Sequence, residues 1–208
     1  MRALLLLLLA SRTGAQRAVR INGTSFTLLH VSDAHVHPTQ DSCMDVVPSR
    51  ASPCNDTNTS RFVRSVAELE RPDLVAYTGD VIDGSASPAP RRAMDELYGV
   101  AIGAGAYWGA SLGNHEDQVR NFSRDAIYEY ILGMPGNSLS QHGPVTDSPG
   151  NWYLDLIGSD EEAPVARLVF FDSRDDEVFR DGGHSVPNVA LTPPSQYGRS
   201  TSRSTARS

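Results

Sequence analysis

The sequence has little of what a nucleic-acid binder or a membrane-spanning protein needs. Its formal net charge is −7 and its pI is about 5.3, and no run rich in Lys or Arg lies in the part that we expect to fold. The basic face that a phosphate backbone requires is missing, so we expect no nucleic-acid partner. The apolar runs are also too short for a stable membrane span. What remains, 39% hydrophobic and 21% charged over 208 residues, is ordinary globular composition.

The longest apolar run lies at the N-terminus and is typical of a secretory signal. Arg2 supplies a positive charge, residues 3–10 form a short apolar segment with six consecutive leucines, and residues 13–15 (Thr-Gly-Ala) resemble a cleavage site. We therefore predict a signal peptide at residues 1–15 and a protein that is secreted or lies in the lumen of the secretory pathway. The alternative is a buried N-terminal helix, but the leucine run has no amphipathic period.

Cysteine is scarce, and its use agrees with export. Cys43 and Cys54 are the only two and enclose ten residues, so they are a candidate disulfide; two free thiols in a cytosolic protein are the alternative. Export would also make Asn-x-Ser/Thr triplets candidates for glycosylation. Such triplets begin at Asn22, Asn55, Asn58 and Asn121.

Three apolar runs end in polar motifs, and this repetition is the main organisational feature of the chain. The runs at residues 25–31, 74–77 and 105–112 are typical of buried strands. Because the carboxyl ends of parallel strands share one edge of a sheet, we expect the three motifs to meet there. Around these strands we predict helices at residues 58–71, 88–103 and 122–132, and further strands at residues 151–156 and 165–171.

Each motif offers side chains that bind metal ions. Asp33 and His35 follow the first run, Asp80 follows the second, and residues 113–116 (Gly-Asn-His-Glu) with Asn114 follow the third. Such residues hold hard divalent, ferric and zinc ions, and a pair of ions needs one bridging ligand, usually a carboxylate. Average residue usage makes Gly-Asn-His-Glu a chance event in about one chain of this length in a thousand.

Together these motifs resemble those of the calcineurin-like metallophosphoesterases, and most of all the secreted branch related to purple acid phosphatases in plants and fungi. The resemblance implies an α/β fold, a double β-sandwich flanked by helices, of which we expect the N-terminal portion. We place this domain at residues 22–197, incomplete at its C-terminal end, and expect a disordered Arg/Ser/Thr-rich tail at residues 198–208. The matching segments are residues 29–35, 71–80, 112–116, 150–153 and 168–173.

The resemblance also implies a role for each motif residue. Asp33 and His35 would bind a first metal ion, Asp80 would bridge two ions, and Asn114 would bind the second. The ions would belong to the Fe, Zn or Mn class, and the substrate would be a phosphoric ester. A metal-activated hydroxide would attack phosphorus while His115 assists the leaving group. The implied function is that of a metal-dependent phosphatase.

Two departures from the family pattern keep a second interpretation open. Where the purple enzymes have a tyrosine ligand this chain has Asp83, so we expect no purple colour. The family's later Gly-His-x-His motif is missing, and Gly183-His184-Ser185-Val186 matches only half of it. A truncated, catalytically silent pseudo-phosphatase or a gene-model fragment, poorly soluble because one sheet face is uncovered, is therefore the alternative. A serine hydrolase, whose Gly-x-Ser-x-Gly nucleophile elbow we do not expect here, is the weakest interpretation.

Four other polar residues have roles that the sequence leaves less defined. His30 lies inside the first strand and is expected to be a core histidine with a satisfied partner. His37 could extend the ligand set, but His35 fits the motif better. Glu116 either supports His115 from behind or lies on the surface. Asp172 marks either the exit of a strand or the rim of the site.

Overall fold

The computed structural model describes residues 17–21, 23, 25–37, 56–84, 89–119, 122–143, 148–172 and 189–192. Several expectations lie outside these residues and stay predictions: the signal peptide at 1–15, the tail at 198–208, and His184, Cys43, Cys54, Asn22, Asn55 and Asn121. Of the glycosylation candidates, Asn58 is described, and it is exposed near the start of the first helix.

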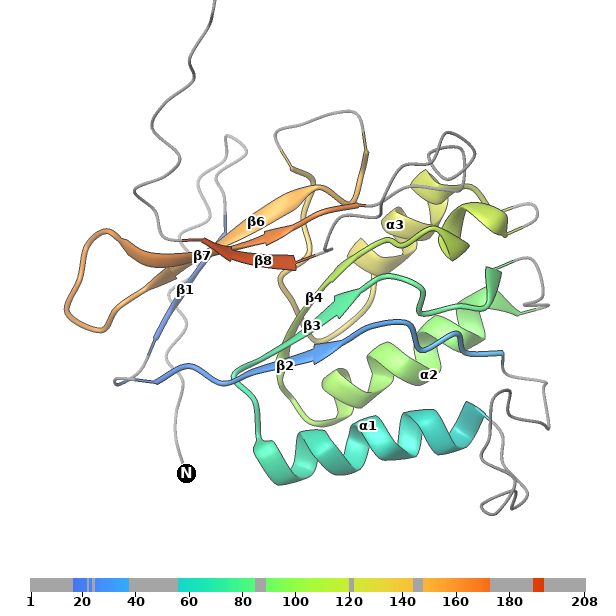
Figure 1. The fold of residues 1–208 in the computed structure, drawn as a ribbon, viewed down its shortest axis with the longest axis horizontal. Coiled ribbons are helices and arrows are strands. Elements are labelled where there is room, and N and C mark those ends of the chain that lie inside the picture. The colour runs from blue at the N-terminus through green and yellow to red at the C-terminus, as the bar shows by residue number, and fades with distance from the viewer. Residues whose placement is uncertain are drawn as a thin grey trace, which may run out of the picture.

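Two four-stranded sheets form the framework (Figure 1). The parallel sheet has the order β2-β3-β4-β5, with strands Leu28–Val31, Leu74–Thr78, Tyr107–Ser111 and Asn137–Ser138. The mixed sheet has the order β1-β6-β7-β8, with strands Ala18–Arg20, Trp152–Ile157, Pro164–Phe170 and Val189–Thr192. Strand β1 runs parallel to β6, whereas β6, β7 and β8 are antiparallel.

Helices connect the strands of the parallel sheet, and their ends follow local sequence signals. Helix α2 has Pro90 in its first turn, and Ser123 caps α3 by accepting a hydrogen bond from the amide of Ala126 at 3.3 Å. Helix α1 gives way to Arg71 in the left-handed conformation (φ 46°), before Pro72. The bounds are Asp56–Glu70 for α1, Pro90–Gly103 for α2, Arg124–Leu132 for α3 and His115–Gln118 for the short 3₁₀ helix η3.

The core has an apolar layer on each face of the parallel sheet. Between this sheet and the helices, the rings of Tyr77, Tyr98 and Trp108 are fully buried and in mutual contact, with centroids 4.8 to 6.3 Å apart. On the other face, Trp152 stacks on Phe170 and donates a hydrogen bond to the carbonyl of Ala110 at 2.8 Å. A Cβ atom at Gly109 would lie 2.6 Å from the Trp152 ring, so glycine there lets the two sheets approach.

The structure confirms an α/β fold, with helices and with parallel and antiparallel sheets. The predicted strands and helices are present, although β2 begins three residues later than expected. The unpredicted elements, β1, β5, β8 and η3, have two to four residues each, too few for a recognisable period. Among the described residues, none of the helices has both the length and the apolar character that crossing a bilayer would take.

Candidate metal centre

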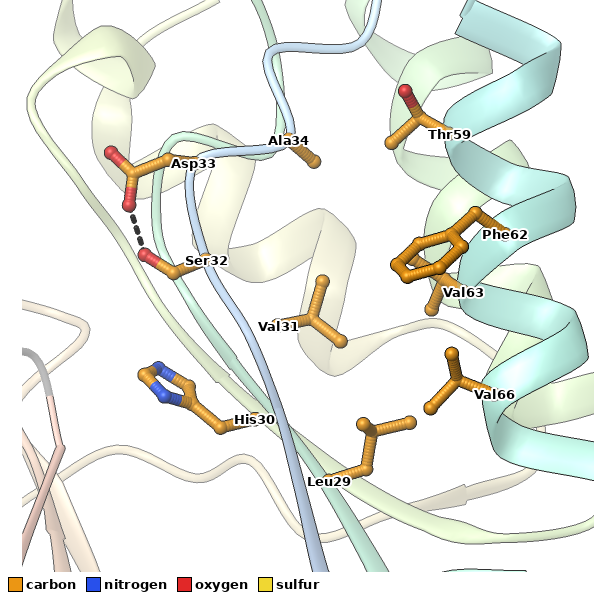
Figure 2. A pocket seen from close by; sticks show the side chains of 10 residues that line it. All are labelled: Leu29, His30, Val31, Ser32, Asp33, Ala34, Thr59, Phe62, Val63 and Val66. Atoms are coloured by element: carbon orange, nitrogen blue, oxygen red, sulfur yellow. Dashed lines mark hydrogen bonds between the residues drawn. The ribbon is translucent and has the colours of Figure 1, made fainter. Parts of the chain in front are cut away.

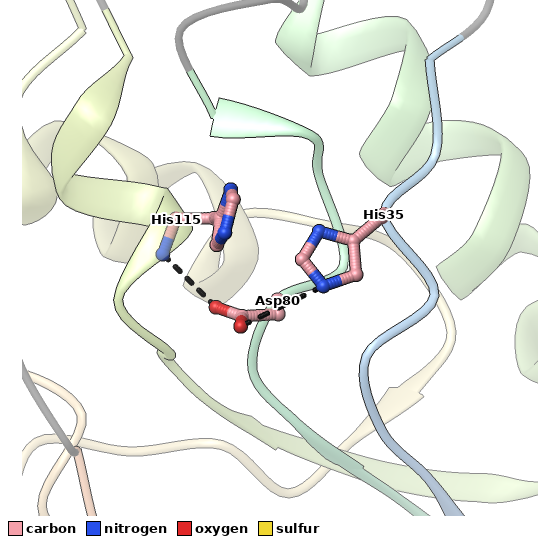
Figure 3. Close-up of side chains that lie close together, drawn as sticks. All are labelled: His35, Asp80 and His115. Carbon is pink, nitrogen blue, oxygen red and sulfur yellow. Dashed lines mark hydrogen bonds and ion pairs between the residues drawn. The ribbon is translucent and has the colours of Figure 1, made fainter. Parts of the chain in front are cut away.

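The exits of β2, β3 and β4 bring three potential ligands together (Figure 3). One ligand atom each from His35, Asp80 and His115 lies within 4.8 Å of the other two. His35 Nε2 is 3.8 Å from Asp80 Oδ2, and the two imidazole rings meet edge to face with centroids 4.4 Å apart. The expectation that the motifs share one edge of the parallel sheet is therefore confirmed for these three residues.

Asp33 lies at the border of this group. Its carboxylate Oδ1 is 4.0 Å from His35 Nε2, the same nitrogen that lies 3.8 Å from Asp80 Oδ2. The Asp33 side chain is 67% exposed, and Figure 2 shows it bonded to the hydroxyl of Ser32. Asn114 precedes η3 directly, on the same loop as His115, and its carbonyl accepts a hydrogen bond from Asp117 at 3.2 Å.

Left-handed backbone is concentrated at these strand exits, which hold three of the four non-glycine residues with positive φ in the described part of the chain; Arg71 is the fourth. Asp33, His35 and Asp80 have φ angles of 53°, 45° and 49°, the left-handed region that costs a non-glycine residue about 1–3 kcal/mol. Backbone hydrogen bonds maintain the arrangement, because the amide of His35 donates to Asp80 O at 2.9 Å and that of Val36 to Val81 O at 2.8 Å. The pairing of β2 with β3 thus continues past the strands and places His35 beside Asp80.

Two motif glycines allow the loops after β3 and β4 to touch. A Cβ atom at Gly79 would clash with the backbone of Gly113, and one at Gly113 would clash with the carboxylate of Asp80. Gly79 also has a φ of 92°, which favours glycine. The glycines that precede Asp80 and Asn114 are thus needed for close approach, whatever the ligands do.

Glu116 is buried, which makes the surface interpretation wrong. It is 2% exposed, and its carboxylate accepts hydrogen bonds from the amides of Asp80 at 3.0 Å, Val81 at 2.9 Å and Gly113 at 2.7 Å. Burial raises the pKa of Glu116 and the nearby Asp80 carboxylate adds to the rise, while these three hydrogen bonds oppose it. Neither sequence interpretation anticipated that this residue binds the backbone of two motif loops.

Arg124 and Asp172 support the loop that follows β4. The guanidinium of Arg124 donates to Gly113 O at 2.9 Å and to Asp172 Oδ2 at 3.0 Å, and pairs with Asp117 at 3.0 Å. The Asp172 side chain is fully buried and also accepts hydrogen bonds from Ser148 and Gly150. Asp172 is therefore at a strand exit, where it connects β7 to the β4 loop. No motif marks Arg124 in the sequence.

Three nearby groups complete the surroundings of the cluster. His30 has a partner as expected, Thr78 Oγ1 at 2.7 Å, but its side chain is exposed, so the core assignment is wrong. Asp83 Oδ1 lies 3.8 Å from His35 Nδ1. The Nδ1 atom of His115 is buried without a hydrogen-bond partner, and a Cβ atom on Gly84 would lie 2.9 Å from it.

Two further features lie near the cluster of His35, Asp80 and His115 but include none of these three residues. The expectation that the serine-hydrolase pattern is absent is wrong, because residues 109–113 (Gly-Ala-Ser-Leu-Gly) match it. Ser111 nevertheless ends β4 fully buried, so its hydroxyl cannot meet a substrate. A groove of about 310 Å³ separates β2 from α1 and is lined on both sides by apolar residues such as Val31 and Phe62. Figure 2 shows His30 and Asp33 on the other side of β2, away from these side chains.

Comparisons with known proteins agree on one family. The sequence profile described as Calcineurin-like phosphoesterase matches residues 26–201. "Probable inactive purple acid phosphatase 29" of Arabidopsis thaliana is 34% identical over 78% of this chain and 44% of its own length. "Phosphatase DCR2" of Saccharomyces cerevisiae is 29% identical over 77% of this chain and 29% of its own.

The chain spans less than half the length of the curated relatives that it matches. Among solved structures, a dimetal phosphatase from Danio rerio aligns with 71% of this chain and 44% of its own, at 21% identity and a TM-score of 0.47.

Proposed function

This chain belongs to the calcineurin-like phosphoesterase family, and from that membership we propose that it hydrolyses phosphoric esters at a dinuclear metal centre. The observation that carries the proposal is the convergence of His35, Asp80 and His115 from three strand exits, with ligand atoms within 4.8 Å of one another. The family accounts for the reaction class, and the convergence accounts for where in this chain the reaction would occur.

The residues present fit a metal ion of the Fe, Zn or Mn class. Imidazole nitrogen and carboxylate oxygen are the donors that such ions accept, and His35 Nε2 lies 4.0 Å from Asp33 Oδ1 and 3.8 Å from Asp80 Oδ2. Asp80 is only 9% exposed, and among the described residues no arginine pairs with it. A buried carboxylate without a cationic side chain is costly unless a cation neutralises it.

We assign the ligands as the motifs suggest. Asp33 and His35 would hold one ion, Asp80 would be a ligand of both ions, and Asn114 would be a ligand of the second. When bound, the ions supply Lewis acidity and lower the pKa of a water that attacks phosphorus. The left-handed backbone at Asp33, His35 and Asp80 supports this assignment, because strained conformations of this kind concentrate at functional sites.

His115 assists departure of the leaving group in this proposal. Its amide donates to Asp80 Oδ1 at 2.9 Å, which couples its position to that of the bridging carboxylate. Since Nδ1 is buried against the backbone near Gly84, Nε2 is the nitrogen that can face a substrate and give a proton to the leaving oxygen.

A catalytically silent protein is the second candidate, because three of the relatives at 34–35% identity are named "probable inactive" purple acid phosphatases. The deciding experiment measures metal content by mass spectrometry and hydrolysis of p-nitrophenyl phosphate with Mn²⁺, Zn²⁺ or Fe. We expect His115→Asn to retain the metal and to lose about 10²–10⁴-fold in rate.

His142→Asn is the matched control, because His142 is exposed and pairs with Glu129 outside the cluster. Metal without hydrolysis in the unaltered chain would favour the silent candidate. A chain that holds no metal, or a His115 variant of unchanged rate, would refute the proposed site.

We also propose that the chain enters the secretory pathway. The signal-like residues 1–15 and the exposed position of Asn58 support this proposal. Expression of the full chain in a eukaryotic host tests it, with an N-terminus at Gln16 and a glycosidase-sensitive mass expected; a cytosolic product that retains residues 1–15 would contradict it.

A further inference from the structure

The carboxylate of Glu116 connects two loops that carry candidate ligands. The β3 loop, residues 79–81, contains Asp80, and the β4 loop, residues 112–116, contains Asn114 and His115. Glu116 Oε2 accepts hydrogen bonds from the amides of Asp80 and Gly113, and Oε1 accepts one from the amide of Val81. One side chain of the β4 loop therefore fixes the position of the β3 loop.

No other polar contact of Glu116 is found among the described residues, and none of its three partners is charged. Hydrogen bonds from amides to a carboxylate are stronger than those between neutral groups, which offsets part of the cost of burying it. The neighbouring Asp80 carboxylate adds negative charge at the same place. The two neighbouring carboxylates of Glu116 and Asp80 therefore favour the binding of a cation beside them.

The bonds also act where the backbone is strained. Asp80 has a φ of 49°, and two of the three amides that donate hydrogen bonds to Glu116 are those of Asp80 and of the next residue, Val81. Without an acceptor these buried amides would be unsatisfied, and the β3 loop could relax to an ordinary conformation. The Asp80 carboxylate would then leave its place beside His35 and the amide of His115.

We propose that Glu116 is a positioning residue for metal binding, which keeps the β3 and β4 loops in the one arrangement in which Asp80 and His115 converge. This proposal rests on the proposed function, because it takes the convergence of these side chains to be a metal site. Glu116 itself is not a ligand here, since both of its oxygens are occupied by backbone amides.

The test compares Glu116→Gln with the unaltered chain. The amide group of glutamine has nearly the same size, but its NH₂ end meets a backbone N–H where a carboxylate oxygen accepted one. Mn²⁺ affinity is measured by calorimetry well below the melting temperature, and amide hydrogen exchange is measured by NMR without metal. We expect the Kd for Mn²⁺ to rise about 10–100-fold, and exchange of the Asp80, Val81 and Gly113 amides to accelerate about 10-fold or more.

Asp155→Asn is the matched control, because Asp155 pairs with Arg167 in the mixed sheet, outside the cluster, and should change neither quantity. A Glu116→Gln variant that binds Mn²⁺ within about twofold of the unaltered chain, or keeps the three amides protected, overturns the proposal. A merely structural role would lower the melting temperature and leave the affinity unchanged at low temperature, which is also a refutation.

Two arms keep the test decisive if the variant does not fold or the chain binds no metal. In the unaltered chain the three amides should exchange slowly and alike; rates as fast as those of exposed loop amides would refute the role of Glu116. Absence of Mn²⁺ binding to the unaltered chain would refute the proposed function, whereas the exchange rates would still decide whether Glu116 holds the loops together.

Discussion

Strands β2 and β3 are parallel neighbours paired residue for residue, and both lead to an aspartate with a left-handed backbone, yet they differ in burial. All residues of β3 are buried, whereas in β2 only Val31 is. The side chain of Asp80, after β3, is 12% exposed, and that of Asp33, after β2, is 67% exposed. Two similar motifs therefore have very different surroundings.

This difference shows that the half of the candidate centre after β3 and β4 is held in place by contacts within the protein. Glu116 and Arg124 hold the β3 and β4 loops through hydrogen bonds that are buried for Glu116 and partly buried for Arg124. The exit of β2 depends on backbone pairing with the β3 loop, such as His35 N to Asp80 O. We therefore expect changes on the β3 and β4 side to lower both stability and metal affinity, and changes at Asp33 to lower affinity alone.

The largest effect is expected from breaking the support of the β4 loop. Arg124→Ala leaves the fully buried carboxylate of Asp172 without its cation, which costs about 3–5 kcal/mol in the free energy of unfolding. Urea denaturation followed by circular dichroism measures this. The double variant Arg124→Ala with Asp172→Ala is the control, because removing both charges should recover part of the loss. Equal losses in the single and double variants would show that the loss does not come from the unpaired carboxylate of Asp172.

The next largest effect is expected from alkaline pH, which should lower the free energy of unfolding through tyrosines on the β3 side. Burial raises the pKa of Tyr77, a residue of β3, and of Tyr98, a residue of α2 whose ring contacts that of Tyr77. Because the pKa of each tyrosine is higher in the folded chain than in the unfolded chain, its contribution to the free energy of unfolding is complete below the unfolded pKa of about 10. That contribution is lost as the pH rises above about 10. We expect a loss of about 1 kcal/mol per tyrosine and pH unit there. Absorbance at 295 nm should show both ionising only with unfolding; ionisation in the folded chain would contradict this.

The comparison itself is tested by replacing the two aspartates. Asp80→Asn should lower Mn²⁺ affinity by about 100-fold or more, since it removes a central donor. Asp33→Asn should lower it less, about 10-fold, and change the free energy of unfolding by under about 0.5 kcal/mol, because the side chain is exposed. Calorimetry and urea denaturation measure the two quantities. A larger loss of affinity at Asp33 would reverse the ranking.

Sequence reasoning found the motif residues but not what holds them. Asp33, His35, Asp80 and His115 were recognisable because each follows an apolar run and belongs to a short motif. Their convergence follows from parallel pairing, which the apolar runs predict.

The supporting residues could not be found in this way, because their roles depend on contacts between distant segments. Arg124 and Asp172 are 48 residues apart in the sequence, and Glu116 reaches amides 35 and 36 residues away. A buried carboxylate with only backbone partners has no pattern that separates it from a surface glutamate. Short strands such as β1 and β5 were missed because two or three residues show no alternation.

The smallest effect is expected from replacing Asp83, which lies two residues after the β3 loop. The replacement tests whether Asp83 is a further metal ligand. Its carboxylate lies 3.8 Å from His35 Nδ1, beyond hydrogen-bond distance, and both side chains are partly exposed, at 35% for His35 and 23% for Asp83. Such a pair contributes about 0–1 kcal/mol, so Asp83→Ala should leave metal content intact and change Mn²⁺ affinity by less than about fivefold. Mass spectrometry and calorimetry check this against Asp80→Asn. Loss of metal from Asp83→Ala would show that Asp83 is a ligand and would add one residue to the ligands on the β3 and β4 side.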